Sequence, residues 1–390
     1  MSSSAESLVP ADLRRGLRNY WYPIFRSSDL EADKPLGITR VGEPLVLWRD
    51  AEGATHLFPD RCGHRAARLS LGDLVDGRLQ CRYHGLQYDG SGQCRFVPTE
   101  LEMDGPCARE IKVTSYPVEE IGGLIWGYIG DVEMFPAPPL EVDPVLTDPS
   151  YASLIAEQNW DSNWLLVQDN SGDPTHVPFL HGHFAARLRD AGLTLEPLPG
   201  GNPVIYKEAY SDLVTDELVI EQTRPDQVLI TRKGATEDHS ATFDEVLFTL
   251  PCGVKIWVPI PDGGPPVRIL EYHLPVDAER TVVYSWAGRP CSSEEERERT
   301  LQAYEMMYPY FQLVWDEDNW ITGSQGDVAE TWRAEHLLPF DVGTTAIRKL
   351  ILRAYRDQQR RIAESEKQHA TAGASRGESK EPVEAVGSTR

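Results

Sequence analysis

Two short segments that each combine a cysteine with a histidine constrain this chain more than any other feature. The first is Cys62-x-His64, and the second, after 16 intervening residues, is Cys81-x-x-His84. The chain of 390 residues contains only six cysteines and ten histidines, so a chance match to both segments is rare. One thiolate and one imidazole from each of two loops predict a metal centre held between those loops.

Two kinds of centre use such ligands. Zinc fingers usually pair cysteine with cysteine and histidine with histidine, whereas here the two residue types alternate along the chain. A two-iron cluster with two cysteines on one iron and two histidines on the other fits the alternation, as in a Rieske [2Fe–2S] centre. The residues around both segments, 61–65 and 81–85, are similar to the two cluster loops of Rieske proteins. The other four cysteines have no such partners and are predicted to be small buried side chains.

A second group follows in the pattern Asp173-x-x-His176-x-x-x-x-His181. Two imidazoles and one carboxylate from elsewhere in the chain form a facial triad, which leaves three positions open on a non-haem Fe(II) ion. On a regular helix, positions five apart diverge by about 140°, and positions seven apart share a face. His183 is therefore an alternative second ligand. Pro178, between the two histidines, favours an irregular helix to which this angular rule does not apply. His181 therefore stays the predicted ligand.

The pattern of apolar, turn and proline residues along the chain predicts two domains. Short strands and turn residues between 35 and 130 indicate an all-β domain, and the proline-rich segment 135–139 resembles a linker. A helix-like stretch from Trp160 to Phe184, alternating strands over 203–288 and a long helix from about Ser293 then indicate an α+β domain with an antiparallel sheet. The expected organisation is an N-terminal lead 1–18, a first domain 19–136, a second domain 137–362 and a disordered tail 363–390.

Composition excludes several functions. Lys and Arg total 38 against 61 Asp and Glu, a net charge of −23, which argues against nucleic acid as a partner. No run of 18 apolar residues is present, so we expect no membrane span. The opening residues lack the apolar stretch of a secretory signal, and six cysteines are too few for a disulfide scaffold. We therefore expect an acidic cytoplasmic enzyme.

The two groups in this order, over about residues 19–355, resemble the oxygenase α-subunit of Rieske non-haem iron oxygenases. The branch with phthalate dioxygenase-type ring hydroxylases and vanillate O-demethylases is the most similar. The resemblance implies a β-rich Rieske domain joined to a helix-grip (START-like) catalytic domain, assembled as a homotrimer. It also implies that electrons pass from the [2Fe–2S] cluster of one subunit to the mononuclear Fe(II) of its neighbour, where O2 is activated.

The resemblance extends to individual residues. Asp173 matches the carboxylate that links a cluster histidine to an iron histidine across the subunit interface, and Asn170 matches a position near the iron. The third iron ligand comes from an acidic segment before the last helices, where we predict Asp318, with Asp316 and Glu317 as alternatives. The chain departs from the family at Ala66, where a glycine often follows His-Arg.

The implied activity is hydroxylation or oxidative demethylation of an aromatic or polycyclic small molecule. The chain has no glycine-rich dinucleotide fingerprint, so NAD(P)H must act through a separate reductase, with or without a ferredoxin. Two other classes stay open at this point. One is a Rieske-type electron carrier, and the other is a helix-grip ligand-binding protein without an iron site.

Overall fold

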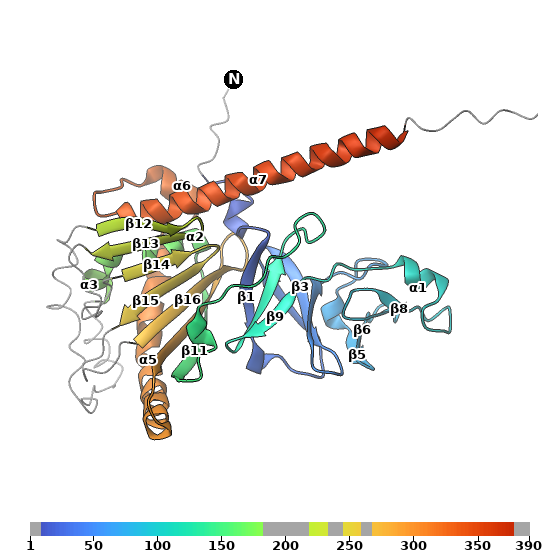
Figure 1. Cartoon of the computed structure of the whole chain (residues 1–390), viewed down its shortest axis with the longest axis horizontal. Coiled ribbons are helices and arrows are strands. Elements are labelled where there is room, and N and C mark those ends of the chain that lie inside the picture. Colours follow the sequence, from blue (N-terminus) through green and yellow to red (C-terminus); the bar gives the residue numbers. More distant parts are fainter. Residues whose placement is uncertain (1–8, 182–217, 233–244, 259–266, 378–390) are drawn as a thin grey trace, which may run out of the picture. The chain divides into compact units, whose positions relative to one another are not determined.

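Three small antiparallel sheets make up the first part of the chain, as predicted for an all-β domain. The computed structural model describes residues 9–181, 218–232, 245–258 and 267–377 (Figure 1). The expected helical lead has a single 3-10 turn in its described part, η1 (Leu13–Arg15). The sheets are β1 (Tyr20–Arg26), β10 (Leu124–Ile129) and β9 (Val118–Ile121); β2 (Leu36–Arg40), β3 (Glu43–Arg49) and β4 (Thr55–Pro59); and β5 (Asp73–Val75), β6 (Arg78–Gln80), β7 (Gln87–Tyr88) and β8 (Cys94–Phe96).

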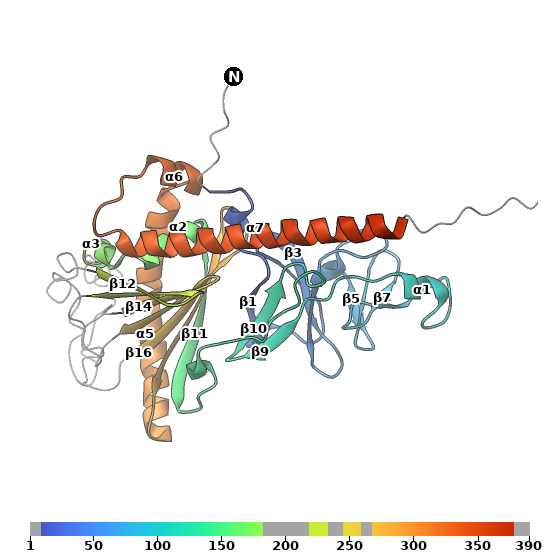
Figure 2. The ribbon, with the colours of Figure 1, turned by 45° about the horizontal axis from the view of Figure 1, so that its top comes forward.

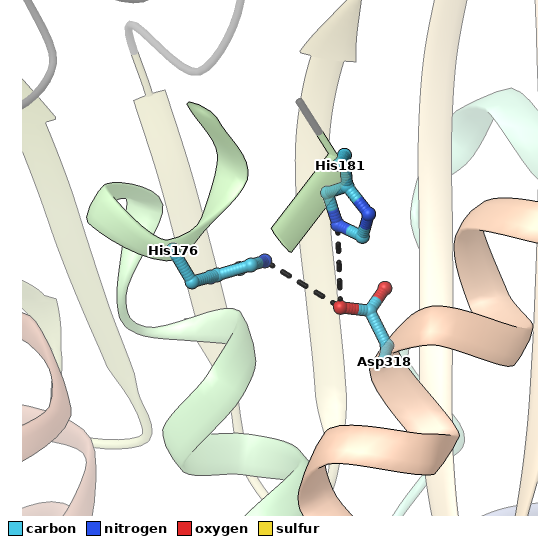
Figure 3. A group of neighbouring side chains, drawn as sticks. All are labelled: His176, His181 and Asp318. Atoms are coloured by element: carbon cyan, nitrogen blue, oxygen red, sulfur yellow. Dashed lines mark ion pairs between the residues drawn. The ribbon is translucent and has the colours of Figure 1, made fainter. Parts of the chain in front are cut away.

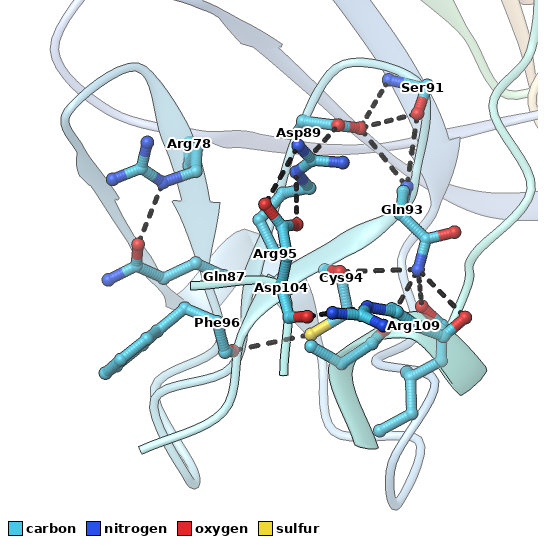
Figure 4. A network of polar contacts seen from close by, with 12 residues as sticks. Arg78, Gln87, Asp89, Ser91, Gln93, Cys94, Arg95, Phe96, Asp104 and Arg109 are labelled. Atoms are coloured by element: carbon cyan, nitrogen blue, oxygen red, sulfur yellow. Dashed lines mark hydrogen bonds and ion pairs between the residues drawn. The ribbon is translucent and has the colours of Figure 1, made fainter. Parts of the chain in front are cut away.

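Polar side chains close the β7–β8 turn and tie it to the short helix α1 (Pro106–Glu110) (Figure 4). The Asp89 carboxylate accepts hydrogen bonds from the backbone amides of Ser91 and Gln93. The Gln93 side-chain amide then donates to the carbonyl groups of Ala108 and Ile111 at 2.9 and 3.0 Å. The two carbonyl groups also accept from the backbone amides of Ile111 and Cys94, so the Gln93 side chain adds a second donor to each of them.

The second part of the chain is built on one antiparallel sheet of seven described strands, which confirms the predicted α+β domain with a large antiparallel sheet. Strand β11 pairs with β17 along its whole length, and β17 pairs in turn with β16. The strand order is β11 (Tyr151–Trp160), β17 (Thr281–Pro290), β16 (Val267–Pro275), β15 (Gly253–Val258), β14 (Glu245–Thr249), β13 (Gln227–Arg232) and β12 (Leu218–Arg224).

Strand β17 is buried on both faces, which explains its run of apolar and aromatic residues. Tyr284 and Trp286 belong to a core cluster that also contains Tyr22 and Ile24 of β1. Val283, on the opposite face, packs with Trp160 and residues of the helical layer. The two expected domains therefore share a core, and the chain up to Ile351 forms one compact unit, with a second unit from Leu352 onward.

Helices α2 (Trp164–Ser171) and α5 (Glu294–Ser324) pack against the sheet, and each begins at a capping residue. The Asn163 side chain accepts a hydrogen bond from the amide of Leu165 at the start of α2, and the Ser293 side chain accepts from the amide of Glu296 at the start of α5. Helix α5 lies across one face of the sheet (Figures 1 and 2). The helices are α2 (Trp164–Ser171), α3 (Val177–Leu180), α5 (Glu294–Ser324), α6 (Val328–Ala334) and α7 (Val342–Gly377), with 3-10 turns η2 (Ser27–Asp29), η3 (Leu69–Leu71), η4 (Pro144–Leu146) and η5 (Pro174–His176).

The structure differs from the sequence-based expectation at two helices. The helix-like stretch predicted from Trp160 begins only at Trp164, because Trp160 ends β11; Phe184 lies outside the described residues. The tail predicted to be disordered from residue 363 is helical in its described part, since α7 continues to Gly377. Alanine, glutamate, lysine and glutamine in this segment cannot build a core, but they favour a helix. No described helix is long and apolar enough to cross a membrane.

One buried arginine joins the two three-stranded sheets, which contain β1 and β2, to the large sheet. Arg40, only 7 % exposed, donates to the Ile24 carbonyl at 3.0 Å and to the Tyr284 hydroxyl at 3.2 Å. The same hydroxyl donates to the Ile24 carbonyl at 3.2 Å. Burial raises the pKa of Tyr284 to about 12, so the phenol keeps the proton that it donates.

We expect Tyr284→Phe to lower the free energy of unfolding by about 1–3 kcal/mol, because it leaves one buried guanidinium donor without an acceptor. Anaerobic denaturation of the cluster-loaded protein measures this change. Tyr83→Phe is the matched control, since the Tyr83 side chain is 59 % exposed. Equal midpoints for the two variants would contradict the role assigned to Tyr284.

Candidate metal centres

The two Cys/His loops share one backbone construction. In each loop the cysteine carbonyl accepts a hydrogen bond from the amide four residues later at 2.9 Å, and the cysteine amide donates to the carbonyl five residues later at 2.8 Å. The fourth residue after each cysteine has a positive φ, 56° at Ala66 and 71° at Gly85. Both loops therefore curl in the same way around Cys62 and Cys81.

The structure brings the four predicted cluster residues of these loops into one place. The thiols of Cys62 and Cys81 are buried, whereas His64 and His84 are exposed with ring centroids 4.7 Å apart. The Tyr88 hydroxyl, which sequence reasoning missed, lies 3.1 Å from the Cys62 sulfur and accepts a hydrogen bond from the next amide. The protein side of the site is thus thiol and the solvent side imidazole.

This donor set fits a two-iron cluster better than one zinc ion. Thiolates suit one iron and imidazoles the other, which matches the separation of the buried and exposed donors. A zinc ion needs all four donor atoms around one point. Among the described residues, these four do not form a group of ligand atoms that all lie within 4.8 Å of one another.

A second group does converge in that way. His176, His181 and Asp318 place their ligand atoms within 4.8 Å of one another (Figure 3). The Nε2 atoms of the two histidines lie 3.5 and 3.3 Å from the same carboxylate oxygen, Oδ1 of Asp318. His176 ends η5, α3 supplies only four residues, and His181 follows as its C-cap. This broken helix brings together two histidines that a regular helix would separate.

The predicted ligand Asp318 and its two alternatives, Asp316 and Glu317, have different surroundings. Asp316 is exposed and accepts a hydrogen bond from the Gln312 side chain at 3.0 Å. Glu317 is 3 % exposed and faces Nδ1 of His181, the nitrogen on the far side of the ring from Asp318. Asp318 is therefore the acid that meets both histidines at Nε2. His183, the alternative histidine, lies outside the described residues.

Asn170 and Asp173 both contact this group, by different means. The Asn170 side-chain amide donates to Oδ1 of Asp318 at 3.0 Å. The backbone carbonyl of Asp173, and not its carboxylate, accepts from Nδ1 of His176. The Asp173 carboxylate instead caps η5 by accepting from the Thr175 amide at 2.8 Å. In this single chain Asp173 thus orients His176 through its main chain.

The two imidazoles and the carboxylate are a donor set for a mononuclear Fe(II) ion. They are nitrogen and oxygen donors without a thiolate, and three such protein ligands leave positions open for other molecules. Burial alone lowers the pKa of His181, but the carboxylates of Asp318 and Glu317 outweigh it and raise the pKa. The group therefore attracts positive charge.

Sequence reasoning also missed the residues that hold α2 beside this group. Asp169, next to Asn170, pairs with Arg348 of α7 at 2.7 Å and accepts from Trp332 of α6 at 2.8 Å. Burial raises the pKa of Asp169 to about 6, against the opposing effect of Arg348. The partners lie more than 160 residues away in the sequence, so no local pattern could have indicated them.

The positive φ of Ala66 makes the first loop strained. A left-handed conformation costs a residue with a Cβ atom roughly 1–2 kcal/mol, and glycine avoids that cost. We expect Ala66→Gly to stabilise the protein by about 1 kcal/mol, measured as the midpoint of anaerobic denaturation. Ala67→Gly, next in the chain and without a positive φ, is the control and should destabilise. A loss of stability in both variants would contradict this account of the loop.

Comparison with known protein families gives a match for each of the two parts of the chain. The family described as Rieske [2Fe-2S] domain matches residues 20–117. The family described as vanillate O-demethylase oxygenase C-terminal domain matches residues 160–357, half of the chain.

Among the relatives, the oxygenase subunit of 3-chlorobenzoate-3,4-dioxygenase from Comamonas testosteroni is 30 % identical over 278 residues, which cover 70 % of this chain and 59 % of that protein. The terminal oxygenase component of carbazole 1,9a-dioxygenase from Metapseudomonas resinovorans is 27 % identical over 369 residues, which cover 87 and 91 %. The solved structure of dicamba monooxygenase bound to dicamba has the same fold, with a TM-score of 0.66, 22 % identity and 88 and 98 % of the two chains covered. The chain covers 59 % or less of several of the relatives that it matches, and it belongs to the Rieske non-haem iron oxygenase family, with a C-terminal part that matches the vanillate O-demethylase oxygenase C-terminal domain.

Proposed function

We propose that this chain is the terminal oxygenase of a multicomponent system that hydroxylates or oxidatively demethylates an aromatic or polycyclic small molecule. One observation carries the proposal: a single chain has both the paired Cys/His loops and the convergence of His176, His181 and Asp318. A cluster without the second group would only carry electrons. Relatives named as aromatic-ring dioxygenases and O-demethylases support the substrate class.

Each residue then has a role that follows from its surroundings. Cys62, Cys81, His64 and His84 would hold the [2Fe–2S] cluster, and the exposed imidazoles would be the side at which electrons enter and leave. His176, His181 and Asp318 would hold the Fe(II) ion, which when bound supplies the activation of O2. Asn170 fixes the orientation of Asp318, and the Asp173 carbonyl fixes that of His176. Electrons would come from NAD(P)H through a separate reductase, with or without a ferredoxin.

The surface around the exposed imidazoles supports a docking role. The residues next to the cluster ligands in the sequence include four exposed arginines and Tyr83, which is 59 % exposed and has its ring centroid 5.9 Å from the Arg65 guanidinium. The chain as a whole has a net charge of −23, so a second copy offers acidic surface. We propose that this face contacts the catalytic domain of a neighbour in a homotrimer. The arginines are Arg61, Arg65, Arg68 and Arg82.

The cytoplasmic location of the protein stays a prediction.

The iron ligands are tested by single substitutions. His176→Ala, His181→Ala and Asp318→Ala should each remove one iron per chain, keep the EPR signal of the reduced cluster and abolish substrate-dependent oxygen uptake. Asp316→Ala, at an exposed neighbour, should keep all the iron. Full iron content in the His181 variant would favour His183 as the ligand. Substrate-dependent oxygen uptake in all three variants would overturn the proposal. If the unaltered protein took up no oxygen with any of a broad set of aromatic compounds, an electron carrier or a ligand-binding protein would be favoured instead.

The docking face is tested by charge reversal. The double variant Arg65→Glu and Arg82→Glu should lower the molar mass in solution and slow coupled turnover at least tenfold, because like charges meet across the interface. Arg299→Glu, at an exposed position of α5, is the control and should do neither. Slower turnover at an unchanged mass would assign the face to the ferredoxin or reductase and contradict its place in the trimer.

A further inference from the structure

The two histidines of the second group are held by partners of different charge. Nδ1 of His176 contacts a neutral backbone carbonyl, whereas Nδ1 of His181 contacts the carboxylate of Glu317 at 2.9 Å. Both rings present Nε2 to Asp318, so the difference lies entirely on the side away from the ligand atoms. Glu317 is therefore not a competitor of Asp318 but acts from behind His181.

Glu317 is placed where a carboxylate is costly. Its side chain and that of His181 are each 4 % exposed, and the next residue in the chain is a second buried acid, Asp318. Two carboxylates on opposite sides of one buried imidazole repel each other, and a buried carboxylate loses its hydration. Positive charge at the point where His176, His181 and Asp318 converge offsets both costs, since it lies within reach of both carboxylates.

We infer that Glu317 is a positioning residue of the iron site, which acts through His181. Its carboxylate accepts a hydrogen bond from Nδ1–H, so the ring is held in the tautomer whose Nε2 lone pair faces the metal position. The same contact makes the imidazole a more basic ligand. With Asp318 it also brings two negative charges to a site for a divalent ion, so the loaded site is close to neutral.

This role differs from that of the partner of His176. A backbone carbonyl can orient a ring, but it adds no full charge and no substitution can remove it. The chain therefore has one ligand histidine held by a neutral carbonyl group and one held by the carboxylate of Glu317. The inference rests on the proposed function, because it assumes that the second group holds a metal ion.

The test is metal affinity, not turnover. Protein with an intact cluster is freed of its mononuclear iron and titrated anaerobically with Co(II), whose visible absorption reports binding to nitrogen and oxygen ligands. We expect Glu317→Gln, which keeps a hydrogen-bond acceptor but loses the charge, to bind about tenfold more weakly, and Glu317→Ala about a hundredfold more weakly. Asp316→Asn, at the exposed neighbour, should bind within about twofold of the unaltered protein.

The Co(II) affinities of the variants separate a role of Glu317 from a failure of the proposed iron site. The EPR signal of the reduced cluster must be unchanged in every variant, which shows that the chain is folded. Equal Co(II) affinity in the unaltered, Gln and Ala proteins would overturn the role of Glu317 and leave the proposed function intact. An equal loss in Asp316→Asn would also overturn it, since the effect would then be one of general charge. No Co(II) binding by the unaltered protein would overturn both the inference and the proposed iron site.

Discussion

Burial of strand β17 on both faces is the constraint on which the rest of the structure depends. On one face Tyr284 and Trp286 complete a core with β1, so the Cys/His loops and the large sheet belong to one compact unit. On the other face Val283 packs with Trp160 of β11, Val167 of α2 and Trp315 of α5. A strand in this position must present apolar side chains to both faces. The ligand residues therefore come from helices and loops.

The chemistry of the second centre follows from that division. Its acids come from the last two turns of α5, which packs against the sheet, and its histidines come from the broken helix after α2. Trp315, one turn before Asp318, donates to Glu271 of β16 at 3.1 Å and fixes the rotation of α5 at that point. On the other side, Asp169 ties α2 to Arg348, so Asn170 is held within reach of Asp318. The site is therefore assembled by contacts that lie outside it.

The sequence was most informative where ligands lie close together in the chain. The Cys62 and Cys81 loops follow a local pattern of metal ligands, and Pro178 indicated the irregular helix on which His176 and His181 lie. The start of α5 next to Ser293 was predictable because an acidic first turn suits a helix N-terminus. The sequence could not indicate the positive φ of Ala66, or the pairing of Glu317 with His181 across 136 residues, because both depend on tertiary structure. Helix α7 was underestimated, since low apolar content excludes a core but not a helix.

The central claim is that one chain holds two different iron centres, and metal content measures this most directly. Protein purified anaerobically should contain three irons and no zinc per chain, with a Rieske-type EPR signal after reduction by dithionite. Two irons with the same signal would contradict the second centre. Zinc without such a signal would contradict both.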